Sequence, residues 1–302
     1  MAGISGKFGG ANPFATHAEY NVVPQSIVDG FLDKKIEMRQ EIQDELGIDE
    51  ATAIHITQIL ADNIDIFGTV DDEGCLTYSD EMRDYFRFRA NSFWKDAQLD
   101  AQPVANPHIQ LTAGSPGAGK TTFLEDNRQP NSIYVDPDEQ ALMKLGIYDG
   151  IIDIVRNLAK ENQQLSDMIG DYGHTNFARM VSYTYGRWGS NYISNTMMNN
   201  AAKGNYNIDF GTTASGGGVP FLFKKDAPEE GVVGFIPRGY RVTINVIDAP
   251  MDVKEASNIQ RHREGSGKFV PKKDITGKAE ALKDNFDLYP EITALSNGHI
   301  NY

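Results

Sequence analysis

The sequence predicts an α/β fold in which helices flank a mostly parallel sheet, preceded by a helical extension. Two patterns indicate this fold. Four strand candidates, at residues 109–113, 132–135, 206–211 and 240–247, alternate with helical stretches, which is typical of sheets built from strand–helix–strand units. A glycine-rich segment also follows the first of these strands and begins a helix, at residues 114–126. In this topology, ligands bind at the carboxyl ends of the strands.

The chain of 302 residues divides by composition into three predicted segments. Residues 1–20 are rich in Gly, Ser and Asn, and we expect a flexible tail. Residues 21–104 are the helical extension, because apolar residues recur at helical spacing after Pro24, in residues 49–67 and in residues 79–94. Gly47 and Gly68 are suited to end the first two helices. Residues 105–302 contain the four strand candidates and form the predicted main domain.

The glycine-rich segment fits the pattern G-x-x-x-x-G-K-[ST], which is a phosphate-binding loop. Its glycines let backbone N–H groups turn toward phosphates, and the following helix presents its positive N-terminus. Lys120 is expected to contact the β and γ phosphates of ATP, and Thr121 to bind Mg²⁺. The setting between a strand and a helix predicts a fold like that of the P-loop NTPases and kinases. The predicted ATP-binding residues here are Gly114, Ser115, Pro116, Gly117, Ala118, Gly119, Lys120, Thr121 and Thr122.

Composition and charge exclude several function classes. The formal net charge of −14 argues against binding of DNA or RNA, which requires a basic surface. The single cysteine, Cys75, cannot form an internal disulfide, and the sequence has no apolar segment of 18 residues. We therefore expect a cytoplasmic protein without a nucleic-acid or membrane partner, and export by a dedicated secretion machine stays open.

Two carboxylates follow the second predicted strand. Asp136 and Asp138 would lie near the phosphate loop, because the carboxyl ends of parallel strands share one edge of the sheet. Asp138 or Asp136 could accept the proton of a substrate hydroxyl, while the other carboxylate binds Mg²⁺ or orients the acceptor. The alternative is a turn, which the Asp-Pro sequence favours by itself.

A cluster of cations follows the fourth predicted strand. Arg261, Arg263 and Lys268 stand out in a chain that is acidic overall. Phosphoryl transfer needs cations over the transferring group, and an arginine on a closing lid helix supplies one. The alternative is a solvated basic helix face. A guanine-reading N-K-x-D sequence is absent, which disfavours a GTPase.

These motifs resemble the bacterial zeta-toxin kinases and related effectors of bacterial pathogens, over residues 109–275. The order of the motifs and their spacing are similar in both. The resemblance implies that Asp138 is the general base, with Asp136 beside it at the substrate. Arg261 matches the first lid arginine. Lys268 stands at the position of the second, where lysine keeps the charge but loses the bidentate geometry.

The third predicted strand resembles the family's strand that ends in Glu-Gly-Thr, with one departure. Phe210 occupies the glutamate position, before Gly211 and Thr212. That glutamate contacts the acceptor in the family, so the resemblance assigns Thr212 to substrate binding and makes Asp209 a possible substitute for the glutamate. Adjacent strand residues, however, face opposite sides of a sheet. Arg263 completes the expected substrate-binding set.

The leading hypothesis is a kinase that uses ATP and Mg²⁺ to phosphorylate a hydroxyl of a small nucleotide-containing metabolite, such as a nucleotide sugar or NAD. The resemblance also implies a toxin or effector role, with an antitoxin or a chaperone as protein partner. Two alternatives remain. The chain could bind ATP as a regulatory module without transfer, or it could act as an interaction protein through its N-terminal helices.

Overall fold

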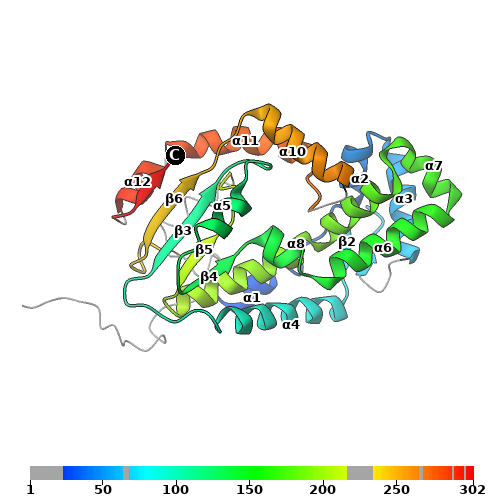
Figure 1. The fold of residues 1–302 in the computed structure, drawn as a ribbon. Coiled ribbons are helices and arrows are strands. Elements are labelled where there is room, and N and C mark those ends of the chain that lie inside the picture. The colour runs from blue at the N-terminus through cyan, green and yellow to red at the C-terminus, as the bar shows by residue number, and fades with distance from the viewer. Residues whose placement is uncertain (1–22, 64–67, 216–233, 265–267, 288, 296) are drawn as a thin grey trace, which may run out of the picture.

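A five-stranded parallel sheet forms the centre of the structure (Figure 1). In this computed structural model, the described residues are 23–63, 68–215, 234–264, 268–287, 289–295 and 297–302. The predicted tail of residues 1–20 lies outside these ranges. The sheet has the order β4-β5-β3-β6-β7, every neighbouring pair is parallel, and its strands are β3 (His108–Ala113), β4 (Ser132–Val135), β5 (Asn207–Phe210), β6 (Arg241–Val246) and β7 (His299–Asn301).

This sheet confirms the predicted α/β fold class. Each of the four strand candidates forms a strand within a residue or two of the predicted bounds. The sequence did not predict β7, which pairs with β6 at the edge of the sheet. After the central strand β3, the chain forms β4 and β5 on one side of β3 and then β6 and β7 on its other side. The phosphate loop therefore leaves the sheet at the point where the strand order reverses, where ligands bind in such folds.

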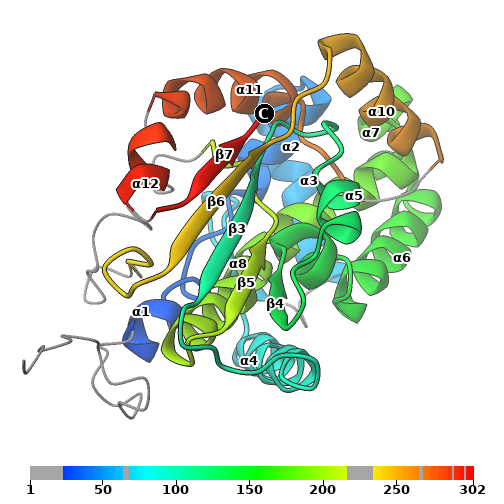
Figure 2. The ribbon, with the colours of Figure 1, turned by 60° about the vertical axis from the view of Figure 1, so that its left-hand side comes forward.

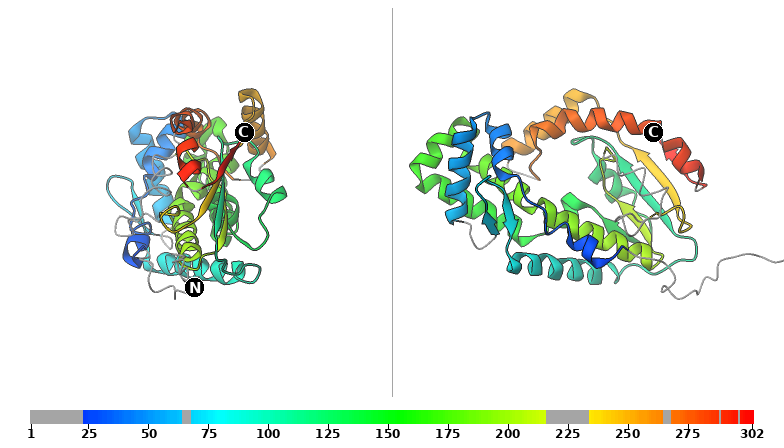
Figure 3. Two further views of the ribbon diagram at one scale, coloured as in Figure 1. Left: turned by 90° about the vertical axis from the view of Figure 1, so that its left-hand side faces the viewer. Right: turned by 180° about the vertical axis from the view of Figure 1, so that it is seen from behind.

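Helices cover both faces of the sheet, as the edge-on view in Figure 3 (left) shows. The 30-residue helix α8 (His174–Lys203) packs on β4 and β5 on one face, and α5 (Lys120–Asp126) lies on the other (Figure 2). The remaining helices of this part are a π-helix (Pro137–Leu142), α6 (Gly146–Glu161), α7 (Gln163–Ile169), a 3₁₀ turn (Gly170–Tyr172), α10 (Met251–Glu264), α11 (Lys272–Phe286) and α12 (Tyr289–Leu295). None of the helices in the described ranges combines the length and apolar character of a membrane span.

The N-terminal part is helical as predicted, but it also contains an unpredicted hairpin. Its helices are α1 (Gln25–Asp29), α2 (Met38–Leu46), α3 (Glu50–Asn63) and α4 (Asp80–Ala97), and the antiparallel strands β1 (Gly68–Val70) and β2 (Leu76–Tyr78) precede α4. The helical spacing after Pro24 is thus interrupted, because Ile36 exchanges two backbone hydrogen bonds with Leu76 (2.8 and 2.9 Å). Gly47 ends α2 in a left-handed conformation, as expected. Gly68 begins a strand instead of ending a helix.

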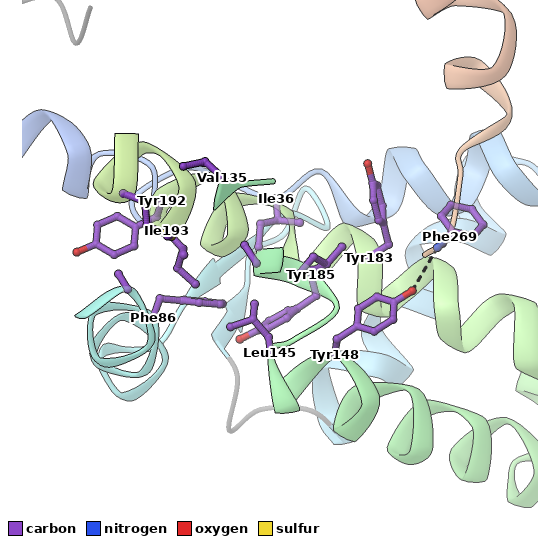
Figure 4. Packing of buried hydrophobic residues seen from close by; sticks show 14 of the residues in the cluster. Ile36, Phe86, Val135, Leu145, Tyr148, Tyr183, Tyr185, Tyr192, Ile193 and Phe269 are labelled. Atoms are coloured by element: carbon purple, nitrogen blue, oxygen red, sulfur yellow. Dashed lines mark hydrogen bonds between the residues drawn. The ribbon is translucent and has the colours of Figure 1, made fainter. Parts of the chain in front are cut away.

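One buried apolar core joins the N-terminal helices to α8 (Figure 4). Phe86 of α4 is fully buried and packs against α8 so closely that a Cβ at Gly189 would lie 2.1 Å from its ring. Tyr78 donates a hydrogen bond from its Oη to the carbonyl of Tyr185 and accepts one from the Gly189 N–H (3.1 Å). The N-terminal part therefore holds α8 in place, and α8 in turn supports the strands that carry the candidate site.

Candidate active site

The phosphate loop lies between the end of β3 and the start of α5, as predicted. Gly119 takes φ +90°, a left-handed conformation that glycine adopts without strain, and it is the N-cap residue of α5. The side chain of Lys120 turns back over the loop and donates a hydrogen bond from Nζ to the carbonyl of Ser115 (3.0 Å). Ser115 is 1% exposed, and its Oγ has no hydrogen-bond partner among the described residues. The loop thus contains a buried hydroxyl that a ligand could satisfy.

Asp136 shapes the loop that follows β4. Its Oδ1 accepts hydrogen bonds from the N–H groups of Asp138 (2.8 Å) and Glu139 (2.9 Å), so its carboxylate caps the π-helix. Burial, and then the charge of Asp138, raise the pKa of Asp136. A Cβ at position 211 would lie 2.3 Å from Asp136 Oδ2, so the approach of β5 to this carboxylate requires Gly211. The Asp-Pro turn predicted as an alternative and the two candidate carboxylates are therefore parts of one structure.

Asp138 lies between two cations. Its Oδ1 accepts a hydrogen bond from Arg187 Nη1 (2.6 Å), and its Oδ2 accepts one from Lys268 Nζ. Burial alone would raise the pKa of Asp138, but the charges of Lys268 and Arg187 outweigh burial and lower it. Asp138 is therefore ionised at neutral pH and paired through both oxygens.

The two lid cations reach the site from separate anchors. Arg261 is in the last turn of α10, where its carbonyl accepts a hydrogen bond from the buried Arg179 of α8 (3.2 Å). Lys268 is followed by Phe269, which is 1% exposed and donates its backbone N–H to Tyr148 Oη (3.3 Å; Figure 4). These anchors place both cations at the pocket that the phosphate loop also lines.

One pocket brings most of the predicted residues together. Its lining comes from the phosphate loop, the loops after β4 and β5, the last turn of α10 and Lys268, in detail Pro116, Gly117, Gly119, Lys120, Thr121, Thr122, Asp136, Asp138, Glu139, Gly211, Thr212, Thr213, Arg261 and Lys268. Gly114, Ser115 and Ala118 are the predicted loop residues outside this lining, and all three are buried beneath the loop. Arg263 belongs to α10, and its side chain lies outside the described part of the structure.

Asp209 does not reach this pocket. It is fully buried, and its carboxylate accepts hydrogen bonds from Gln129 N–H (3.1 Å), Gln129 Nε2 (2.9 Å) and Ser132 Oγ (2.5 Å). The alternation of side chains along a strand puts Asp209 on the face of β5 opposite to Phe210, and these hydrogen bonds hold its carboxylate at the residues that begin β4. Asp209 therefore stabilises the start of β4. No carboxylate of β5 lines the pocket at the place of the glutamate in the zeta-toxin kinases.

Comparisons with known proteins give matches among solved structures only. No family model and no curated protein matches the chain. Among solved structures, the chain is similar to one from a molecular and structural characterization of the PezAT chromosomal toxin-antitoxin system of the human pathogen Streptococcus pneumoniae. The identity is 14%, the match covers 70% of this chain and 74% of that chain, and the TM-score is 0.38. A match of this strength adds no argument to the resemblance stated from the motifs.

The sequence did not single out Arg187, Glu139, Gly211 or Thr213. Arg187 has the clearest role of these, because it binds the proposed base. A signal for it exists in the sequence: between His174 and Lys203, Arg179 and Arg187 are the only residues with a charge at neutral pH. Long helices with so few charges are buried, and a buried arginine needs an acidic or carbonyl partner. That partner was not identifiable before the fold was known.

Proposed function

We propose that the protein is a kinase that uses ATP and Mg²⁺ to phosphorylate a hydroxyl group of a small nucleotide-containing metabolite. One observation carries the proposal: a single pocket is lined by the phosphate loop, by Asp138 and by the cations Arg261 and Lys268. These are the parts that phosphoryl transfer requires, namely a phosphate cradle, a carboxylate for the acceptor and cations for the transferring group.

The residues present fit ATP and Mg²⁺. The buried Ser115 Oγ without a partner and the cationic Lys120 suit a polyphosphate, and Thr121 offers a hydroxyl to the metal at the start of α5. Burial, and then the charge of Lys268, lower the pKa of Lys120 to about 7. Anionic phosphates would reverse this effect and keep Lys120 charged. The metal would supply charge neutralisation between the phosphates.

Asp138 would accept the proton of the acceptor hydroxyl, and Lys268 links this role to ATP. Asp138 is a weak base as long as Arg187 and Lys268 both bind it, because two cations stabilise its ionised form. The phosphates of ATP would attract Lys268 away from Asp138. The pKa of Asp138 would then rise, so that the base becomes effective only when the donor is bound.

The test is incubation with labelled ATP and a panel of NAD, nucleotide sugars and nucleosides, read by mass spectrometry. For an acceptor that becomes labelled, Asp138→Asn should lower kcat by about 10²- to 10⁴-fold, the usual contribution of a general base. ATP affinity should stay within a factor of about three, because Asp138 is outside the phosphate loop. The exposed Asp62→Asn of α3 is the matched control and should keep full activity. Equal turnover of the Asp138→Asn and Asp62→Asn variants would contradict the assignment.

A second candidate function is an ATP-binding regulatory module without transfer. The pairing of both Asp138 oxygens with cations favours it, and so does Phe210 in place of the family glutamate. In that case, ATP would raise the melting temperature of the protein while no member of the panel becomes labelled. A labelled acceptor excludes this candidate.

We also propose a toxin or effector role, which rests on the motif resemblance alone. Expression in a bacterial host should then arrest growth, and Asp138→Asn should relieve the arrest. An antitoxin or chaperone would be found as a protein that restores growth when it is coexpressed with the wild-type chain. Normal growth with active wild-type protein would contradict this role while leaving the kinase proposal intact.

A further inference from the structure

A second cavity, of about 290 Å³, adjoins the candidate active site on the α8 face of the sheet. It lies between α1 and α8, which run beside each other (Figure 3, right). Its lining is Val23, Ile27, Val28, Phe31, Pro137, Asn191, Ser194, Asn195, Met198, Asn199, Phe210 and Phe235. The phosphate, base and cation sites of the proposed kinase lie outside this cavity.

The cavity and the active-site pocket share a wall at two places. Pro137 lines the cavity, and its chain neighbours Asp136 and Asp138 line the pocket. Phe210 lines the cavity, and the next residue, Gly211, lines the pocket. Consecutive Cα atoms are about 3.8 Å apart, and β4 and β5 pair Val135 with Phe210 at this point. The lining of the cavity is therefore one residue along the chain from Asp138.

The side chains that line the cavity disfavour a charged ligand. None of the lining residues is ionisable, so an anionic group placed there would lose its hydration without gaining a counter-charge. Phe31, Phe210 and Phe235 instead offer aromatic surfaces. Aromatic rings of a ligand are stabilised when they stack on such surfaces. Phe210, which stands where the zeta-toxin kinases have a glutamate, is thus part of a cavity without any charged side chain.

Polar atoms of α8 provide hydrogen-bonding groups on one side of the cavity. Asn191, Asn195 and Asn199 follow one another at a spacing of four residues, so they lie on one face of the helix. Asn199 holds the chain at Val23 through both its amide atoms (3.2 Å each). Ser194 is 4% exposed, and its Oγ has no hydrogen-bond partner among the described residues. A buried hydroxyl without a partner costs free energy unless a ligand or water satisfies it.

We propose that this cavity, the acceptor cavity, binds an uncharged nucleobase-type ring of the acceptor. The phenylalanines contact the faces of the ring, and Ser194 and Asn195 bind its polar edge. The attached sugar then extends past Pro137 and presents a hydroxyl to Asp138. This inference rests on the proposed kinase function for its direction, but the binding itself can be measured without phosphoryl transfer.

The experiment measures nucleoside binding to the full chain with Mg²⁺ and a non-hydrolysable ATP analogue present, so that the donor site is filled. The probes are adenosine, guanosine, cytidine and uridine, with ribose 5-phosphate as a probe that lacks a base. We expect at least one nucleoside to bind to the folded chain, as measured by calorimetry and ligand-observed NMR. Ribose 5-phosphate should show only nonspecific binding, that is, no tighter binding to the folded chain than to the heat-denatured chain. If no nucleoside binds at millimolar concentration, the proposal is overturned.

Two variants locate the bound nucleoside. Asn195→Asp places a carboxylate in the cavity at unchanged volume, and Ser194→Leu fills part of the cavity. Each substitution should raise the Kd for the nucleoside about tenfold or more, which is the effect of losing one buried hydrogen bond. Asn200→Asp, on the same helix but outside the lining, is the matched control and should leave the Kd unchanged. Melting curves show whether each variant is folded. Equal Kd values for the folded Asn195→Asp, Ser194→Leu and Asn200→Asp variants would place the nucleoside elsewhere.

The outcomes separate the two proposals. A nucleoside that binds in the cavity without any labelled acceptor would contradict the kinase and leave the cavity assignment standing. Transfer to an acceptor that has no base, unaffected by Asn195→Asp, would overturn the cavity assignment and leave the kinase standing.

Discussion

Lys120 extends into a pocket where burial, and then the like charge of Lys268, lower its pKa to about 7 from the ordinary lysine value of 10.5. Between these two pH values the unfolded chain binds a proton at Lys120 that the folded chain releases. The free energy of unfolding therefore rises with pH in this window. At or below pH 7 the folded protein carries the full cost of a buried ammonium group.

We predict that Lys120→Met raises the melting temperature of the protein when nucleotide and Mg²⁺ are absent. The gain should be largest at pH 7 and below, and it should shrink as the pH rises toward 10.5, because the wild-type ammonium is then lost. Calorimetric scans at several pH values measure this difference. The exposed Lys160→Met of α6 is the control and should show no such pH dependence. A gain that is constant from pH 6 to 10 would contradict the lowered pKa of Lys120.

Among the elements, α8 organises the site more than any strand does. Arg179 holds the last turn of the lid helix α10, Arg187 binds Asp138, and the asparagine face lines the acceptor cavity. These groups are spaced along 30 residues of one rigid helix. The helix therefore fixes the positions of α10, the proposed base Asp138 and the proposed acceptor cavity relative to one another.

We predict that Arg187→Met raises the pKa of Asp138, because one of the two cations that stabilise its ionised form is removed. The acidic limb of the pH profile of kcat/KM, which reports groups of the free enzyme, should then move to higher pH. Arg187→Lys keeps the charge and should restore most of the wild-type profile. An Arg187→Met profile that loses activity equally at every pH would mean that Arg187 only supports the fold.

The local elements of this fold were predictable from the sequence, and the contacts between distant elements were not. The strand β4 and the phosphate loop follow from patterns within a few residues, as does the N-cap of α4 at Ser79 (3.2 Å from Ser79 Oγ to the Met82 N–H). The break between α1 and α2 depends on Leu76, about forty positions away, which pairs with Ile36. Propensity cannot predict such a partner, because tertiary contacts override local preference.

The same distinction applies to the candidate site. Asp138, Arg261 and Lys268 were predicted because each lies in a motif with a known order along the chain. Arg187 was missed because its partner, Asp138, is 49 positions away and no motif links them. The face of β5 on which Asp209 lies was decided by the register of the strand, and a shift of one residue would have reversed it.

For the whole molecule, the apolar core runs without interruption from the N-terminal helices into the sheet. The side chains of Leu32, Ile56 and Phe86 are each at most 1% exposed and belong to the same core as Ile109 and Ile193. Each large apolar side chain contributes about 1.5–3 kcal/mol when it is buried. The whole free energy of unfolding of a protein domain is only about 5–15 kcal/mol. The loss of several such buried side chains with the N-terminal part therefore removes a gain as large as the small net stability of a typical domain.

We predict that residues 105–302, the segment that holds every motif of the proposed kinase, do not fold when they are expressed without residues 1–104. The exposed apolar face of α8 should make this fragment aggregate or show no cooperative unfolding in circular dichroism. The control is the chain 23–302, which keeps the N-terminal helices and should melt cooperatively near the temperature of the full chain. If the fragment 105–302 melts cooperatively and binds ATP, the N-terminal helices are a separate module. Their role as an interaction surface would then be open to test apart from the kinase site.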